Sequence, residues 1–269
     1  MNDDEQFSDG DNPDGAALIG KVRRWLEMTG YPLEMRVAEA AWKVSPNFVT
    51  QGRNYVDPLS GAVRETDVIV GLSSGERPAS SHVYLVIECK SKPSPWVIFD
   101  DGSDLVDNPE YHLSMALCRT ADDGLGLPSR ARLRSRAFAN GTLLKPSRTG
   151  HGLVEALTPA GKTGERNAAW DAVRASVSAA HGVLAGFDED QLRRSRSALV
   201  AFPVVVTSGG LFRAYLAGGV PTLEEIDVGA VVVRLDRSVE ETRCLIVTET
   251  ALPKVLEEAA ATPGLIEAR

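Results

Sequence analysis

The clearest pattern in the chain is a run of apolar residues that ends in two opposite charges. Residues 81 to 92 read SHVYLVIECKSK, so the apolar stretch VYLVI is followed directly by Glu88, Cys89 and Lys90. An unbroken apolar run of this length predicts a buried strand. Residues two apart in a strand face the same way, which places Glu88 and Lys90 on one face and Cys89 on the other. Charges on a buried face need partners or a ligand, because an isolated buried charge is costly.

Apolar residues at helical spacing predict four helices. We expect them at 16–30, 32–44, 168–184 and 251–261. Gly30 is suited to end the first helix, and Thr250 is a candidate N-cap for the last. The apolar faces of these helices include Trp25, Trp42 and Trp170, which we expect in the core.

Further apolar runs predict strands on both sides of the opening segment. A strand, a turn from Asp57 to Gly61 and a second strand are expected within 47–72, and later strands at 95–99, 197–209, 228–236 and 242–249. Strands that alternate with helices predict an α/β fold with a mixed central sheet flanked by helices. The chain is long enough for one large domain, which we place at 16–269 with an insertion at about 100–166. Within that insertion, residues 109–119 are interpreted as a helix.

Charge is distributed unevenly along the chain. The net charge of the 269 residues is −8, but residues 1–15 carry six acidic groups and no basic one. This stretch is predicted to be a disordered acidic tail, and the remainder has a net charge of only about −2, which does not exclude a polyanionic partner. There is no signal peptide and no apolar run long enough to cross a bilayer, so a cytoplasmic protein without a membrane partner is expected. Three separated cysteines favour neither disulfides nor a zinc site.

Two basic stretches stand out from this acidic background. They supply Arg130, Arg132, Arg134 and Arg136 in the insertion and Arg193, Arg194 and Arg196 after the third helix. Such runs are commonly a solvated face, and they are also the residues that contact phosphates in nucleic-acid-binding proteins. The sequence leaves both interpretations open.

A hairpin would bring a second carboxylate to Glu88. If the strands within 47–72 and 81–92 fold about residues 77 and 78, Val70 lies opposite Leu85 and Asp67 lies opposite Glu88. Directly opposed residues have Cβ atoms about 4.5–5.5 Å apart. Two adjacent carboxylates raise each other's pKa, and a hard divalent cation such as magnesium relieves their repulsion. With Lys90 beside them, these groups suit metal-assisted phosphodiester hydrolysis.

The segments TDVIV and VIECK, taken together, resemble the PD-(D/E)xK nuclease superfamily, whose core carries an acidic residue on one strand and Glu-x-Lys on the next. The resemblance covers about residues 30–99, and the helix from 168 with the strand FPVVVTSG is similar to the rest of that core. It implies a restriction-endonuclease-like fold. Thr66 stands at the position of the proline in the motif's name, a position that varies widely in the superfamily.

The resemblance also implies roles for individual residues. Asp67 and Glu88 would bind Mg²⁺, with Mn²⁺ as a substitute, the backbone carbonyl of Cys89 would be a further ligand, and Lys90 would be the catalytic lysine. Glu34 best matches the acidic residue of the first helix, and Glu39 is the alternative. A helix N-terminal acid favoured by the helix dipole is an equally good interpretation of Glu34.

The expected function is that of a metal-dependent endonuclease acting on nucleic acid, with DNA as the expected substrate, in restriction, defence or repair. A homodimer would allow both strands to be cut. The alternative is a non-catalytic nucleic-acid-binding or assembly module that retains the fold. A simpler alternative for Glu88 and Lys90 is an ordinary ion pair at an exposed hairpin end.

Overall fold

The computed structural model describes most of the chain outside the N-terminal segment and the stretch between 100 and 166. The described residues are 13–74, 81–100, 116–120, 124–125, 131–133, 143, 149–156, 167–188, 190, 192, 198–235 and 241–268. The helices are α1 (Pro13–Glu27), α2 (Tyr31–Trp42), α4 (Ala168–Ala185), α6 (Leu252–Ala261) and the short 3₁₀ helix η2 (Thr262–Leu265). The strands are β1 (Phe48–Val56), β2 (Val63–Ser73), β3 (Ser81–Lys90), β4 (Trp96–Asp100), β5 (Leu117–Thr120), β6 (Gly124–Leu125), β7 (Ala131–Leu133), β8 (Thr149–Glu155), β9 (Ala198–Thr207), β10 (Leu211–Ala217), β11 (Val220–Glu225), β12 (Val228–Val233), β13 (Thr242–Thr248) and β14 (Ile266–Ala268).

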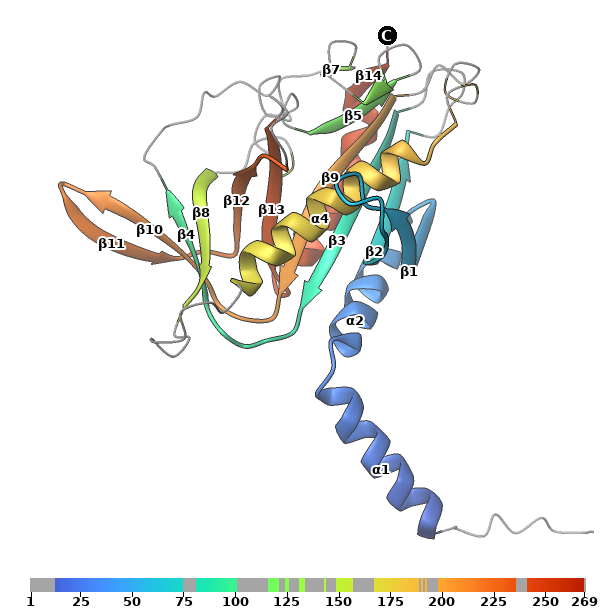
Figure 1. Cartoon of the computed structure of the whole chain (residues 1–269), viewed down its shortest axis with the longest axis vertical. Coiled ribbons are helices and arrows are strands. Elements are labelled where there is room, and N and C mark those ends of the chain that lie inside the picture. Colours follow the sequence, from blue (N-terminus) through green and yellow to red (C-terminus); the bar gives the residue numbers. More distant parts are fainter. Residues whose placement is uncertain are drawn as a thin grey trace, which may run out of the picture.

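Twelve of the described strands form one large mixed sheet. Ten of them follow the order β1-β2-β3-β9-β13-β12-β8-β4-β10-β11, while β5 pairs with β9 and β6 with β5. The pairs β1–β2 and β2–β3 are antiparallel, and β3–β9 and β9–β13 are parallel. The prediction of an α/β fold with a mixed sheet flanked by helices is therefore confirmed (Figure 1).

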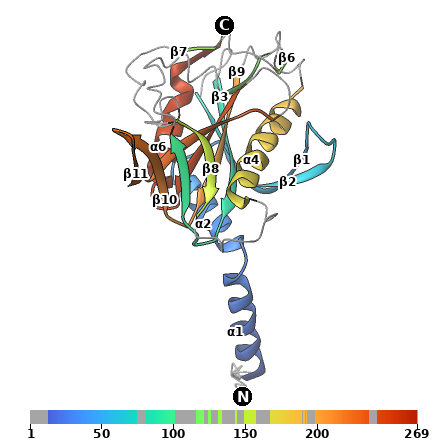
Figure 2. The ribbon, with the colours of Figure 1, turned by 60° about the vertical axis from the view of Figure 1, so that its left-hand side comes forward.

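Helices cover both faces of the sheet around β3. Figure 2 shows α4 on one side of the sheet and α6 on the other. The odd-numbered β3 residues Val83, Leu85 and Ile87 share a buried cluster with residues of α2 and α6, whereas Tyr84 and Val86 share one with α4. This alternation follows from the two-residue period of a strand. Because both faces are covered, β3 has the continuous apolar sequence of a central strand.

Helix α4 approaches the sheet closely, because small residues form its inner side. The hydroxyl of Ser176 donates to the carbonyl oxygens of Val86 and Val204, on the neighbouring strands β3 and β9. At Gly182 a Cβ atom would lie only 2.5 Å from the ring of Tyr55 in β1. A larger residue there would push α4 away from the β1–β2 hairpin.

The prediction of core positions for Trp25 and Trp42 is wrong. Both side chains are more than half exposed. Helix α1 points away from the body of the molecule (Figures 1 and 2), and α2 turns Leu33 and Val37 toward the sheet, which leaves Trp42 on its outer side. Trp170 is half-buried and packs against the cluster beneath α4.

Part of the predicted insertion belongs to the sheet. Strand β8 lies between β12 and β4, and β5 pairs with β9, so the helix interpretation of 109–119 is wrong at its end. Residues 117–119 form a strand and not a helix, because Leu117 and Cys118 are buried where β5 pairs with β9.

Other details also differ from the sequence-based expectations. The residue before α6 is Ala251 and the helix has no side-chain cap, so the capping role predicted for Thr250 is wrong. The β10–β11 hairpin was not predicted, although its turn is formed by Gly218 and Gly219, both with positive φ.

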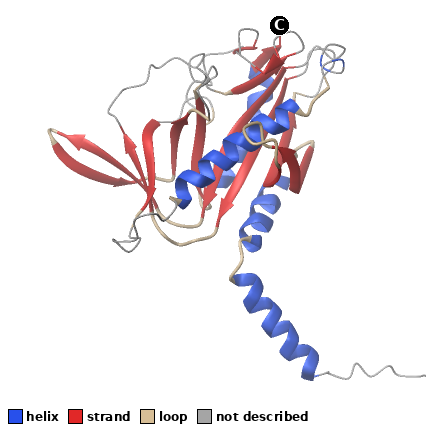
Figure 3. Ribbon diagram, in the orientation of Figure 1, coloured by secondary structure: helices blue, strands red, loops and turns tan. Residues whose placement is uncertain are grey.

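Figure 3 shows the helices and strands of the described residues in separate colours, with α4 lying across the strands of the sheet. None of the described helices has the length and apolar character needed to cross a membrane.

Residues 1–12 of the predicted acidic tail lie outside the described residues, and α1 begins at Pro13.

Candidate functional site

The antiparallel pairing of β2 and β3 follows the register predicted from the sequence. Val70 lies opposite Leu85, and the pairing continues as far as Val68 opposite Ile87. Asp67 and Glu88 are the next residues in this register. They therefore occupy opposed positions where the two strands begin to separate.

A side-chain hydrogen bond closes the ladder at this point. The backbone N–H of Cys89 donates to Oδ2 of Asp67 at 2.6 Å. An aspartate oxygen thus takes the place of a backbone acceptor, while the neighbouring Thr66 pairs with Arg53 of β1. The N–H and C=O of a strand residue point to the same side, so the carbonyl of Cys89 also faces the Asp67 side of β3.

Glu88 and Lys90 form an ion pair on the same face of β3. Nζ of Lys90 lies 2.6 Å from Oε1 of Glu88, and the side chains are 34% and 14% exposed, respectively. The simple alternative of an ion pair is correct in that the contact exists. Its setting is different, because β3 lies between β2 and β9 and not at the free end of a hairpin.

All five residues of the predicted site line one cleft of about 810 Å³. They are Glu34, Asp67, Glu88, Cys89 and Lys90. Its walls are formed by the N-terminus of α2, the turn between β1 and β2, the end of β3 and the N-terminal half of α4. The fold thus brings the helix acid, the strand acids and the lysine together, as the sequence predicts.

The carboxylates of Asp67, Glu88 and Glu34 have few stabilising partners. Burial raises the pKa of Asp67 and Glu88, and repulsion from Asp67 raises the pKa of Glu88 further. Burial also raises the pKa of Glu34, with added repulsion from Asp67 and from the exposed Glu65. The hydrogen bond from Cys89 and the charge of Lys90 offset only part of these effects. A cation placed among these groups would therefore be strongly favoured.

Lys90 and Cys89 have different protonation behaviour. Burial alone would lower the pKa of Lys90, but the nearby carboxylates and its hydrogen bond with Glu88 outweigh burial and raise the pKa. Lys90 is therefore a cation at neutral pH. Burial raises the pKa of the Cys89 thiol, assisted by the surrounding carboxylates. The Cys89 side chain stays protonated, so only its carbonyl oxygen is suited to bind a metal.

Of the two helix acids considered in the sequence, Glu34 is the one that lines the cleft. Glu39 is exposed, and its carboxylate lies 4.0 Å from Lys43 on the outer surface of α2. The difference follows from helix geometry. Glu34 is in the first turn of α2, which faces the ends of the strands, whereas Glu39 lies more than one turn farther along.

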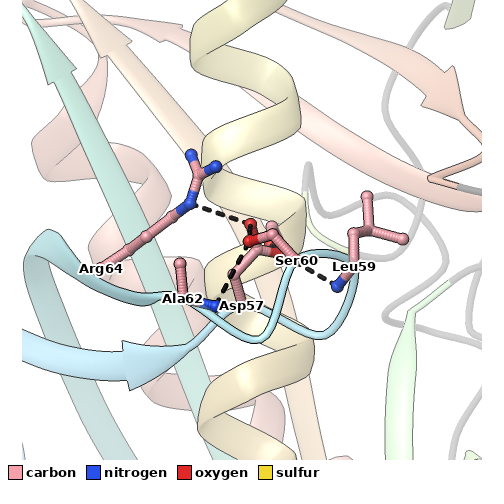
Figure 4. A network of polar contacts seen from close by, with 6 residues as sticks. Asp57, Leu59, Ser60, Ala62 and Arg64 are labelled. Carbon is pink, nitrogen blue, oxygen red and sulfur yellow. Dashed lines mark hydrogen bonds and ion pairs between the residues drawn. The ribbon is translucent and has the colours of Figure 1, made fainter.

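A further acidic residue of the cleft, Asp57, lies in the turn between β1 and β2, and no role was predicted for its side chain. Its carboxylate accepts hydrogen bonds from the Leu59 N–H and from the hydroxyls of Ser60 and Ser178, and it forms an ion pair of 2.8 Å with Arg64 (Figure 4). Burial would raise the pKa of Asp57, but these partners outweigh burial and lower it. Asp57 therefore joins the hairpin turn to α4 and holds Arg64 at the cleft.

Three further basic residues of the cleft, besides Lys90, were not predicted to belong to the site. Arg64, Lys92 and Arg174 line the cleft. They come from β2, the loop after β3 and α4, and no local pattern in the sequence connects these positions.

Most of the arginines predicted to contact nucleic acid cannot be placed. Arg130, Arg134, Arg136, Arg193, Arg194 and Arg196 lie outside the described residues. Arg132 is part of β7, where its backbone pairs with Glu267 of β14, and its side chain is not described. Their assignment stays a prediction.

The donor groups of the cleft suit a cation that keeps part of its water shell. Among the described residues, no three His, Cys, Asp or Glu side chains lie close enough to form a complete metal site. The hydrogen bonds and ion pairs described above use Oδ2 of Asp67 and Oε1 of Glu88, so each carboxylate has a second oxygen for a ligand. Magnesium is commonly held by one or two carboxylates together with waters and substrate phosphate. The residues present fit that kind of binding.

Comparisons of the chain with known protein families, with curated proteins and with solved structures found no match.

Proposed function

We propose that the protein is a metal-dependent nuclease of the PD-(D/E)xK type, with a restriction-endonuclease-like core. The observation that carries this proposal is the opposed position of Asp67 and Glu88 at the end of the β2–β3 ladder, with Lys90 on the same face and in the same cleft. The order of elements supports it: α2, the strands β1 to β3, then α4 and β9, which pairs in parallel with β3. This is the order that the sequence resemblance implies for the core.

The proposed ligands of the metal come from two strands. Asp67 and Glu88 would each contribute the oxygen that is not used in the bonds described above, the carbonyl of Cys89 would contribute a third, and Glu34 would act through water. When bound, Mg²⁺, or Mn²⁺ in its place, supplies Lewis-acid stabilisation of phosphoryl oxygens and lowers the pKa of a water. Both effects promote hydrolysis of a phosphodiester at neutral pH.

Lys90 has a positioning and electrostatic role in this proposal. As a cation bonded to Glu88 it cannot accept a proton from water, so it does not act as a general base. Its ammonium group can donate hydrogen bonds to the attacking water and to a phosphate oxygen. A positive charge held in place before the reaction stabilises negative charge that develops in the transition state.

Nucleic acid is the substrate that suits the cleft. Arg64, Lys92 and Arg174 lie around the carboxylates and would contact phosphates on either side of the bond to be cleaved. Asp57 holds Arg64 in position through its Nε atom, which leaves the terminal guanidinium nitrogens for a ligand. We propose DNA as the nucleic acid, with restriction, defence or repair as the setting.

The proposal is tested by incubating wild type and Lys90→Ala with plasmid, linear and single-stranded DNA and with RNA, in magnesium, in manganese and with EDTA. We expect cleavage that EDTA abolishes and that Lys90→Ala reduces by roughly 10²–10³-fold, the usual effect of removing one stabilising donor. Lys43→Ala, an exposed lysine on the outer side of α2, is the matched control and should cleave normally. Cleavage that persists in EDTA, or a Lys90→Ala protein that cleaves at the wild-type rate, would exclude the proposed site.

The second candidate is a nucleic-acid-binding or assembly module that keeps the fold without cleavage. The lack of a third close carboxylate among the described residues favours it. It predicts DNA binding without magnesium and no products with any substrate. Gel-shift measurements on the same samples separate the two candidates.

A further inference from the structure

The helical arm, which consists of α1, residues 28–30 and α2, carries an apolar surface that the described part of the chain leaves uncovered. Eight large apolar side chains on it are each 53–81% exposed: Leu18, Ile19, Val22, Trp25, Met28, Tyr31, Met35 and Trp42. Figures 1 and 2 show α1 extending from the body on the side of α2. At roughly 100 Å² of exposed area per side chain they sum to roughly 800 Å², more than a monomer usually exposes in one patch.

The exposed residues form a stripe on each helix of the arm. In α1, Leu18, Val22 and Trp25 follow the i, i+4, i+7 spacing of one helix face. In α2, Met35 and Trp42 lie seven residues apart on the side opposite the core-facing Leu33. Both helices therefore present an apolar seam to solvent, although α2 already uses its other side for the core.

We propose that the occupant of this surface is a second copy of the chain, with α1 of each copy packed against α2 of the other. The twofold axis would pass between the Gly30 residues of the two copies, at the bend between the two helices of each arm. The two seams match under this symmetry: Leu18 is twelve residues before Gly30 and Trp42 twelve after, while Trp25 and Met35 are each five residues away. An isologous contact requires such self-complementarity.

Charge distinguishes this arrangement from the pairing of two α1 helices. Helix α1 carries Lys21, Arg23 and Arg24 against the two acids Asp14 and Glu27, so each α1 has a net positive charge and two copies side by side would repel. The same symmetry sets Lys21 of one copy against Glu39 of the other, each nine residues from Gly30. Glu39 is exposed and points away from the core, where it can meet a partner.

Length and area also agree with a dimer. The fifteen residues of α1 span about 22 Å and the twelve of α2 about 18 Å, so each helix covers most of the other. The roughly 800 Å² of apolar area on each copy is what a stable interface of standard size buries per partner. The two bodies would lie at opposite ends of the paired arms, with a cleft in each. This proposal does not depend on the proposed nuclease activity.

Sedimentation equilibrium of the full-length protein gives the first test. We expect wild type to have twice the 28.8 kDa mass of one chain at micromolar concentration. The double variant Trp25→Gln/Met35→Gln should have the mass of one chain and at least a hundredfold weaker association. Glu27→Gln, on the polar side of α1, is the control and should remain dimeric. A monomeric wild type at 100 μM, or a double variant that remains dimeric, would overturn the proposal.

Disulfide trapping tests the geometry. The three native cysteines are buried, so cysteines introduced on the arm would be the accessible ones. We expect a mixture of Leu18→Cys and Trp42→Cys proteins to form a disulfide-linked dimer under mild oxidation, whereas neither variant alone does. Linkage of Leu18→Cys with itself would show α1 against α1 and overturn the arrangement. Monomeric protein that binds anionic lipid vesicles through the arm would also overturn it.

Discussion

Two acidic centres lie in the same cleft, and their surroundings are opposite. Asp57 has three hydrogen-bond donors and an arginine, and its pKa is lowered despite burial. Asp67 and Glu88 face each other with one backbone donor and one lysine between them, and the pKa of each is raised by burial and, for Glu88, also by repulsion from Asp67. Both centres consist of buried or half-buried carboxylates, and the number of donors for each carboxylate differs.

This difference separates a structural centre from a candidate reactive one. A carboxylate with several donors contributes to folding and has little to gain from a ligand. Two opposed carboxylates with too few donors cost stability, and they gain when a cation binds. The proposed site is therefore recognised by the small number of donors around Asp67 and Glu88, and Asp57 provides the comparison within the same protein.

Removal of a carboxylate from each centre should give the largest contrast in activity. We expect Glu88→Gln to reduce cleavage roughly a thousandfold, because loss of a metal ligand removes several kcal/mol of transition-state stabilisation. Asp57→Asn should keep activity within about tenfold, since Asp57 acts through Arg64. Initial rates on supercoiled plasmid in magnesium measure both.

Glu39→Gln is the control for this comparison, because Glu39 is exposed and outside the cleft. Its rate should equal that of wild type. A Glu88→Gln protein with normal activity, or an Asp57→Asn protein that loses as much activity while it stays folded, would reverse the roles assigned to the two centres.

For the free energy of unfolding, the larger loss is expected at Asp57, the centre whose substitution has the smaller effect on activity. Asp57→Asn is expected to lower the free energy of unfolding by about 2 kcal/mol, because hydrogen bonds to a buried charged group are lost. Asp67→Asn should leave stability unchanged or raise it in metal-free buffer, since it removes repulsion. Urea unfolding at pH 7 with EDTA compares them. Equal losses in both variants would mean that Asp67 is also a structural carboxylate.

The sequence predicts the reactive centre better than the structural one, for a physical reason. The apolar run after Asp67 and the apolar run before Glu88 have matching lengths. A shift of one residue in their pairing would move the side chains of one strand to the opposite face, so the register is well defined. This pattern was sufficient to predict their opposition, and the Val70–Leu85 pairing confirms it. Asp57 depends on Ser178, which is 121 residues away in sequence, and no periodicity connects the two positions.

The errors have a common cause as well. Apolar spacing in α1 and α2 correctly predicted helices, and it could not reveal what covers each face. Trp25 and Trp42 were assigned to the core because apolar faces of helices are usually buried, yet both face solvent on the helical arm. The same limit applies at the end of the helix predicted for 109–119, where a short apolar pattern fits either element and residues 117–119 belong to the strand β5.

Magnesium should stabilise the wild type by an amount that increases with the logarithm of the affinity of the Asp67–Glu88 centre. At about 10 mM metal and a dissociation constant of about 1 mM, linkage gives about 1.4 kcal/mol. Asp67→Asn should abolish this increase and Asp57→Asn should retain it, although it begins from a less stable protein. Thermal unfolding with magnesium and with EDTA measures the difference. An increase that survives in Asp67→Asn would place the metal elsewhere.

The dependence of stability on pH should show the smallest effect, and the two centres should again differ in sign. A carboxyl group with a raised pKa holds its proton more tightly in the folded protein, so stability falls as pH rises from the usual carboxyl range toward the raised pKa. Asp67→Asn should reduce that fall, because it removes one such group and relieves Glu88. Asp57 has a lowered pKa, so its contribution is present at neutral pH and lost on acidification, and Asp57→Asn should reduce the loss at acid pH. Urea unfolding of the two variants and wild type between pH 4 and 7.5, in metal-free buffer, gives the slopes. Slopes that change in the same direction in both variants would mean that the two centres do not differ in charge stabilisation, and the distinction between them would fail.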